Sequence, residues 1–193
     1  MLTALCVYCG SNGGASPVYK ESAAALGREL ARRGIRLVYG GSDRGTMGAL
    51  ADAVLSAGGR VTGIIPSGYL ENEAAHRGLA DLRVVGSMHE RKALMTELCD
   101  AFFTMPGGFG TFDELCEALS WAQLRIHAKP VGLWNINGFF DPFLAQLDLA
   151  VREGFLKHEH RALVQPSHDM NALLDHLALA TPAAAPTPEA KWL

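Results

Sequence analysis

The stretch AFFTMPGGFGTFDE, residues 101–114, decides the fold class because its character changes abruptly in the middle. Residues 101–105 form an apolar run as long as a buried strand, and a proline, three glycines, a threonine and two acids follow. A buried strand that ends in a glycine-rich loop and leads into a helix is typical of parallel α/β sheets, where such loops gather at the carboxyl ends of the strands. The stretch therefore predicts both a strand of a parallel sheet and a place where a ligand binds.

The same strand, loop and helix pattern recurs on both sides of this stretch. The alternation predicts an α/β fold, a Rossmann-like doubly wound parallel sheet with helices on both faces. Residues 1–180 are expected to form a single domain, and the Pro- and Ala-rich residues 181–193 a flexible tail. We expect strands at 4–8, 35–39, 60–65, 82–85, 101–105, 130–134 and 162–164, and helices at 17–33, 88–99, 111–125, 140–153 and 170–180, with a further helix that follows residues 40–48 and ends at 58–59.

The composition favours a compact globular protein whose partners are small molecules. Hydrophobic residues make up 49% of the chain and charged residues 19%, which argues against a disordered protein. The net charge of −3 argues against a broad basic face for nucleic acid but allows a local cationic pocket. No apolar stretch is long enough to span a membrane and no secretory signal is recognisable, so we expect a cytoplasmic protein with no disulfide. Cys6, Cys99 and Cys116 fall inside apolar strand or helix patterns, where a reduced thiol packs as a small hydrophobe. Cys6 and Cys9 form a C-x-x-C pair, but Cys6 falls in a predicted buried strand, which favours packing over a redox or zinc site.

Three glycine-rich loops follow predicted strands, at residues 10–14, 40–48 and 107–110. Glycines let the backbone approach a phosphate closely, and the free N–H groups and positive dipole end of the following helix stabilise the anion. Each loop alone is equally well explained as a tight turn, but three loops that converge at one edge of the sheet favour a phosphate site. The chain contains neither G-x-G-x-x-G nor G-x-x-x-x-G-K-[ST], which excludes an ordinary dehydrogenase and a P-loop NTPase.

Two short segments carry charges whose role has two interpretations. Thr111 and Glu114 match a capping box, which by itself explains Glu114 as a residue that closes a helix. In SMHERK, residues 87–92, a second capping box is followed by Arg91 and Lys92 in the first helical turn, where cations oppose the helix dipole. We therefore predict an anionic partner for these cations, either an acidic side chain such as Glu114 or a bound phosphate.

Several segments together resemble a known family. MHERK (88–92), PGGFGTFDE (106–114) and SWAQLRIHAKPVGLWN (120–135), preceded by VYCGS and GGSDRGTMG, strongly resemble the LONELY GUY (LOG) family of cytokinin-activating enzymes. The resemblance implies an N-glycosyl hydrolase that converts cytokinin riboside 5′-monophosphates to free base and ribose 5-phosphate, with no metal or other cofactor, and a homodimer with its active site near the interface. Older labels describe such sequences as lysine decarboxylases, but nothing in this chain marks a lysine as a pyridoxal phosphate anchor.

The resemblance also implies roles for individual residues. Arg91 and Glu114 are expected to be catalytic, and the glycines and threonine of the PGG-x-GT-x-x-E motif to hold the 5′-phosphate. The chain has Ser42, Thr46 and Gly86 where family members often have Gly, Leu and Asp, differences that we expect to bear on base specificity. The implied substrate contacts are Ser11, Gly41, Gly45, Met47, Glu73, Arg91, Lys92, Gly107, Gly108, Phe109, Gly110, Thr111, Phe112, Asp113, Glu114 and Ser120.

Two other functions remain open from the sequence. A broader nucleosidase acting on AMP or related purine nucleotides would carry the same motifs, because these motifs do not encode the shape of the base pocket. A non-catalytic nucleotide or cofactor carrier would use the same loops for binding alone, although the presence of both Arg91 and Glu114 argues against it. The apolar helix positions Leu119, Trp121 and Leu124 and the Phe139-Phe140 region fit either an ordinary core or a second subunit.

Overall fold

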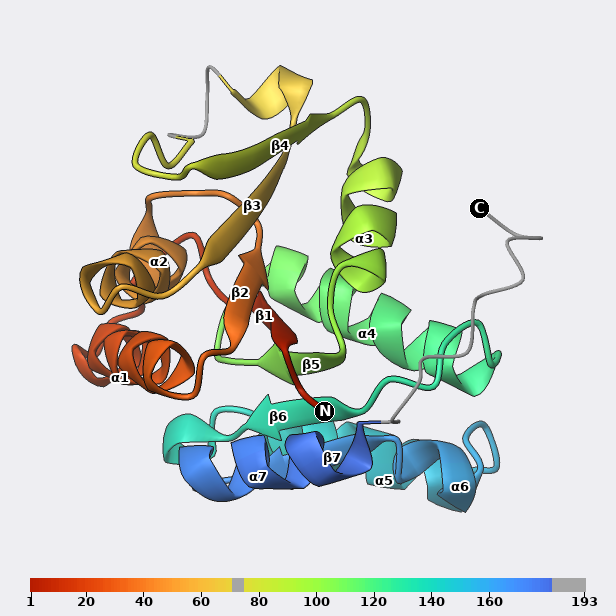
Figure 1. Ribbon diagram of the computed structural model, residues 1–193. Helices are drawn as coiled ribbons and strands as arrows, with labels where there is room; N and C mark the ends of the chain where they lie inside the picture. Colours follow the sequence, from red (N-terminus) through yellow and green to blue (C-terminus); the bar gives the residue numbers. More distant parts are fainter. Residues whose placement is uncertain (71–74, 182–193) are drawn as a thin grey trace.

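The computed structural model describes residues 1–70 and 75–181. Its strands are β1 (Ala4–Tyr8), β2 (Arg36–Tyr39), β3 (Val61–Pro66), β4 (Asp81–Val85), β5 (Ala101–Thr104), β6 (Val131–Trp134) and β7 (Val164–Ser167). They form one parallel sheet in the order β4-β3-β2-β1-β5-β6-β7 (Figure 1). Because the strand order reverses between β1 and β5, the sheet is doubly wound, which confirms the predicted fold class.

Helices cover both faces of the sheet (Figure 1). One face carries α1 (Val18–Arg32), α2 (Gly45–Ser56) and α7 (Met170–Ala180), and the other carries α3 (Met88–Glu97), α4 (Phe109–Gln123) and α5 (Asp141–Arg152). The short α6 (His158–Arg161) lies beside α5, and two single-turn 3-10 helices, η1 (Ser67–Tyr69) and η2 (Ile136–Gly138), follow β3 and β6. Within the described ranges, no helix combines the length and apolar composition needed to cross a membrane.

Strand β1 shows how the sequence produces this layered core. Leu5 and Val7 pack into the cluster beneath α1, α2 and α7, whereas Cys6 and Tyr8 pack into the cluster beneath α3, α4 and α5. Every residue of the strand is buried, as expected for a parallel sheet covered on both faces. Cys6 is therefore a strand residue, as predicted, whereas Cys116, which the sequence places inside an apolar helix pattern, is exposed on α4.

The last strand differs most from its predicted position. The sequence predicts a strand at 162–164, but β7 spans Val164–Ser167, because α6 occupies the preceding residues and Ala162 serves as its C-cap. Pro166 lies inside β7 opposite Leu133. The missing N–H of a proline is tolerated there because β7 is an edge strand.

Candidate active site

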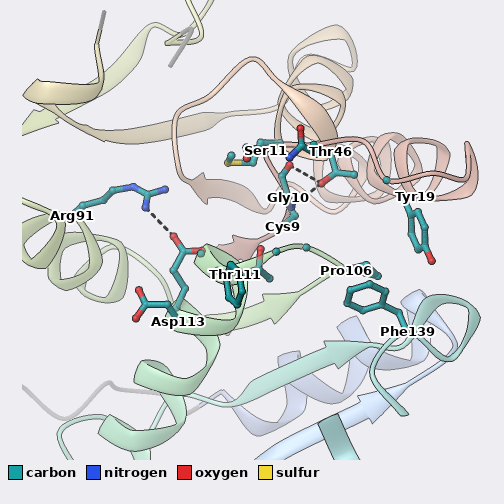
Figure 2. Close-up of a pocket in the computed structure, with 18 of the residues that line it drawn as sticks. Cys9, Gly10, Ser11, Tyr19, Thr46, Arg91, Pro106, Thr111, Asp113 and Phe139 are labelled. Carbon is teal, nitrogen blue, oxygen red and sulfur yellow. Dashed lines mark hydrogen bonds and ion pairs between the residues drawn. The ribbon is translucent and has the colours of Figure 1, made fainter. Parts of the chain in front are cut away.

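A cavity of about 590 Å³ lies where the three predicted glycine-rich loops meet. Loop 10–14 follows β1, loop 40–48 follows β2 and loop 107–110 follows β5, and all three contribute residues to its lining. The predicted convergence of the loops is therefore confirmed. Figure 2 shows Arg91 at one end of the cavity and Tyr19 and Phe139 at the other, with Gly10 and Thr111 between them.

Helix α4 begins directly on the third loop. Gly108 is its N-cap and offers no side chain to the first N–H groups, and the helix starts at Phe109. The predicted start at Thr111 is wrong, and so is the capping box of Thr111 and Glu114, because the glycine cap lets the helix begin two residues earlier and places both side chains in its buried first turns. The N–H groups of a first turn have no helical partner. The positive end of α4 is therefore open towards the cavity.

Two hydroxyl groups lie against the glycine-rich loops, and one of them links two loops by hydrogen bonds. A Cβ atom on Gly107 would overlap Oγ1 of Thr111, so only glycine lets this hydroxyl lie against the loop. Oγ1 of Thr46 accepts a hydrogen bond from the Gly10 N–H at 2.9 Å and donates one to the Gly10 carbonyl at 3.0 Å. Thr46 thus ties the loop after β2 to the loop after β1.

A nearly buried ion pair lies at one end of the cavity. Nη1 of Arg91 donates to Oε1 of Glu114 at 3.0 Å, and Nε of Arg91 donates to the Ile64 carbonyl at 3.0 Å. The two side chains are only 13% and 9% exposed. Gly40 leaves the space for this arrangement, because a Cβ atom there would overlap Nη2 of Arg91. The predicted anionic partner of Arg91 is therefore an acidic side chain, Glu114.

The same burial changes the ionisation of Glu114. Desolvation raises the pKa of its carboxyl to about 7, although the Arg91 charge acts in the opposite direction. Asp113 adds to the rise and Lys92 reduces it. Near pH 7 such a carboxyl is populated in both protonation states, a property typical of groups that exchange protons in catalysis.

Lys92 does not line the cavity. Its Nζ donates to Oδ2 of Asp113 at 3.1 Å and pairs with Oε2 of Glu117 at 2.8 Å. The Lys92 side chain is 11% exposed. Lys92 therefore joins α3 to α4 beside the Arg91–Glu114 pair, and its predicted anionic partner is a pair of acids.

Most of the other candidate contacts line the cavity. Gly41 and Gly45 do not line it, but they have φ angles of +77° and +60°, which allow the sharp course of the loop after β2. Glu73 lies outside the described residues. The candidate contacts in the lining are Ser11, Met47, Arg91, Gly107, Gly108, Phe109, Gly110, Thr111, Asp113 and Glu114.

Phe112 and Ser120 lie on α4 outside the cavity lining. The ring of Phe112 stacks on that of Phe139, with centroids 6.4 Å apart. Ser120 is exposed, and its hydroxyl donates to the Cys116 carbonyl at 2.7 Å. Within this chain, neither residue is therefore positioned to contact a molecule in the cavity.

The cavity lining also includes side chains that are not among the predicted substrate contacts, among them Tyr19, Met88 and Phe139. Tyr19 lies in the first turn of α1, directly after a glycine-rich loop, and this closeness is a signal available in the sequence. Phe139 follows β6 without a glycine run before it. Only the rule that loops at the carboxyl ends of parallel strands share one edge would have indicated it. Across residues 1–70 and 75–181, no three His, Cys, Asp or Glu side chains are grouped to hold a metal ion.

A family model and curated relatives match most of the chain. Residues 47–177 match the family described as "Possible lysine decarboxylase". The chain is 48% identical over 160 residues to the cytokinin riboside 5′-monophosphate phosphoribohydrolase LOG of Oryza sativa subsp. japonica, a match that covers 83% of this chain and 66% of the rice protein. It is 42% identical over 173 residues to the Arabidopsis thaliana enzyme of the same name numbered LOG7, covering 90% of this chain and 80% of that protein.

A solved structure shares the fold at lower sequence identity. The molybdenum cofactor carrier protein of Chlamydomonas reinhardtii aligns with a TM-score of 0.69 and 20% identity, covering 93% of this chain and 98% of that chain. At this identity the similarity shows the fold alone.

Proposed function

The chain belongs to the LOG family of cytokinin riboside 5′-monophosphate phosphoribohydrolases, and we propose that it hydrolyses N6-substituted adenosine 5′-monophosphates to the free base and ribose 5-phosphate. The observation that carries the proposal is the buried Arg91–Glu114 pair, which lies in one cavity with the glycine-capped start of α4. The decarboxylase description fits the cavity less well, because no lysine lines it within the part of the chain that the structure describes.

The start of α4 is suited to hold the 5′-phosphate. Its first N–H groups lack helical partners, its cap is a glycine, and the hydroxyl of Thr111 lies against the loop. The carboxyl of Glu114 belongs to the second turn of the same helix. A nucleotide bound by its phosphate at Gly108–Thr111 would therefore bring its ribose towards Glu114.

Glu114 supplies the chemistry of this reaction. As the bond between C1′ and the base breaks, positive charge develops on the ribose, and a carboxylate beside it stabilises that charge and orients or deprotonates the attacking water. The water oxygen bonds to C1′, and the base leaves with the bonding electron pair and takes up a proton. Arg91 holds the carboxylate in position through the 3.0 Å hydrogen bond.

Turnover measurements test this function directly. Isopentenyladenosine 5′-monophosphate and AMP are offered to the wild type, Glu114→Gln and Glu97→Gln, an exposed acid at the end of α3, while free base and ribose 5-phosphate are followed. We expect Glu114→Gln to lower kcat by about 10² to 10⁴ and Glu97→Gln to leave it unchanged.

The other outcomes identify the alternatives. Faster cleavage of AMP than of the isopentenyl substrate would indicate a broader nucleosidase, and binding of both without cleavage would indicate a carrier. Full activity of a correctly folded Glu114→Gln protein would refute the role of Glu114.

We also propose that the protein is a cytoplasmic homodimer whose residues 1–180 form a single domain. Support for the dimer comes from helix α5, which has no fully buried residue, and from Leu124 at the end of α4, which is 67% exposed. Support for the compartment comes from the four free thiols. Sedimentation equilibrium of the wild type and Leu124→Asp tests the dimer.

A further inference from the structure

The nucleotide position in the proposed function uses only one part of the cavity. With the phosphate at the start of α4 and C1′ near Glu114, the ribose and base lie on the side of Arg91. Tyr19 and Phe139 line the opposite end, on the far side of Thr111 (Figure 2). A nucleoside monophosphate bound in this way leaves the aromatic end unfilled.

The two rings at this end are held in place by their neighbours. Phe139 stacks on Phe112 and meets the edge of the fully buried Phe140, with a centroid distance of 5.0 Å and an interplanar angle of 85°. Tyr19 meets Phe139 edge to face, at 6.2 Å and 75°. Gly14, with φ +73°, lets the loop pass close to Tyr19, since a Cβ atom there would lie 2.5 Å from the ring.

Phe139 nevertheless remains 37% exposed on the cavity side of this cluster. Phe109, also in the cavity lining, is 96% exposed. A ring that its neighbours hold in place and that is partly exposed, such as Phe139, binds a flat aromatic group with little loss of side-chain entropy.

The two ends of the cavity lie over opposite halves of the sheet. Arg91 is bonded to Ile64 in β3, whereas Phe139 follows β6, and the strand order reverses between these halves, at β1 and β5. Doubly wound sheets bind dinucleotides across the crevice at such a reversal. Loop 10–14 connects the two ends here, because Gly10, Ser11, Asn12 and Gly14 all line the cavity.

We propose that the Tyr19–Phe139 end is a second ring-binding subsite, which accepts an aromatic ring joined through a diphosphate to the nucleotide bound at the start of α4. The proposal rests on the proposed function for the position of the first phosphate. The ligand class is a dinucleotide-like 5′-diphosphate, in which one ring lies on the Arg91 side and the second lies against Phe139 and Tyr19.

A matched series of ligands tests the subsite by equilibrium binding. AMP, ADP, ADP-ribose and P1,P2-di(adenosine-5′) diphosphate add in turn the second phosphate, the second sugar and the second ring. Binding is measured calorimetrically on Glu114→Gln protein, which prevents turnover, with and without Tyr19→Leu or Phe139→Leu. Tyr69→Leu is the control, because Tyr69 also lines the cavity but follows β3, in the other half of the sheet.

Stacking of a base on an aromatic side chain contributes about 1 to 3 kcal/mol. We therefore expect the dinucleotide to bind about 5- to 150-fold more tightly than ADP-ribose. Tyr19→Leu and Phe139→Leu should remove this gain and leave the Kd of AMP unchanged, and Tyr69→Leu should keep the gain.

Three results would overturn the proposal. The first is equal affinity for ADP-ribose and the dinucleotide, and the second is a gain that survives both substitutions. The third is an equal weakening of AMP and dinucleotide binding by Tyr19→Leu and Phe139→Leu, which would place the base of the monophosphate itself at the aromatic end. The proposed function is tested independently of this subsite, because it fails only if the wild type does not cleave monophosphates.

Discussion

Replacing Gly40 by alanine should disable the site without touching a charged residue. Gly40 has no positive φ, so its backbone accommodates alanine, but the added Cβ would overlap Nη2 of Arg91. The guanidinium is fixed by its bonds to Ile64 and Glu114, both at 3.0 Å, and must give up at least one of them to move. A hydrogen bond between charged groups contributes about 1.5 to 3 kcal/mol. If the bond to Glu114 is the one lost, kcat/KM should fall by about 10- to 150-fold.

The pH dependence provides an independent readout of the same change. Arg91 lowers the pKa of Glu114, so moving the guanidinium away should raise that pKa above its value of about 7. The acidic limb of the kcat/KM profile should then move to higher pH. The assay is hydrolysis of isopentenyladenosine 5′-monophosphate between pH 5 and 9 by the wild type, Gly40→Ala and Gly68→Ala, a control position with open space around it. Wild-type kcat/KM and an unshifted profile in Gly40→Ala would refute the reasoning.

Three further predictions concern ionisable groups. In the wild type, kcat/KM should rise as pH passes through about 7, where Glu114 ionises, and the residual activity of Glu114→Gln should lack this limb. Lys92→Met should lower kcat/KM and move the acidic limb of its pH profile to higher pH, because Lys92 lowers the pKa of Glu114. Lys92→Arg should restore the rate and the position of the limb, and equal profiles for Lys92→Met and the wild type would contradict this. Burial lowers the pKa of His127 from 6.5 to about 4, so its contribution to stability is present above pH 6.5 and is lost as pH falls towards 4, by up to about 3 kcal/mol. Glu114 has the opposite effect: because its pKa is raised in the folded state, its protonation stabilises the folded protein as pH falls over a similar range. Urea unfolding should therefore show His127→Gln becoming more stable relative to the wild type as pH falls, with no such trend for the exposed His158→Gln.

The sequence predicted the fold and the place of the site because both depend on local signals. Apolar runs that end in glycine give the strands and their loops, and parallel pairing brings those loops together at one edge. Residue 91 was identifiable because a cation in the first turn of a helix opposes the local dipole, so its partner had to come from elsewhere.

The parts of the site that the sequence did not predict depend on exact placement in three dimensions. A threonine and a glutamate three residues apart fit a capping box, and only the glycine cap at 108 shows that α4 starts earlier and buries both. Lys92 neighbours Arg91 in sequence, but a helix turns successive side chains by about 100°, so Lys92 meets Asp113 and Glu117 instead of the cavity. Phe139 belongs to none of the glycine-rich loops, and its place in the cavity lining follows from the position of β6 beside β5 in the sheet.

The glycine cap of α4 also bears on the order in which products leave. A helix capped by glycine is only about a few tenths of a kcal/mol less stable than one capped by Ser, Thr, Asp or Asn, and its first N–H groups stay free to bind an anion. In the proposed reaction, ribose 5-phosphate retains the phosphate that binds the first N–H groups of α4, whereas the free base has no group that binds there. We therefore expect the base to depart first and the sugar phosphate last, so that ribose 5-phosphate is the product that competes with substrate and raises the melting temperature of the protein.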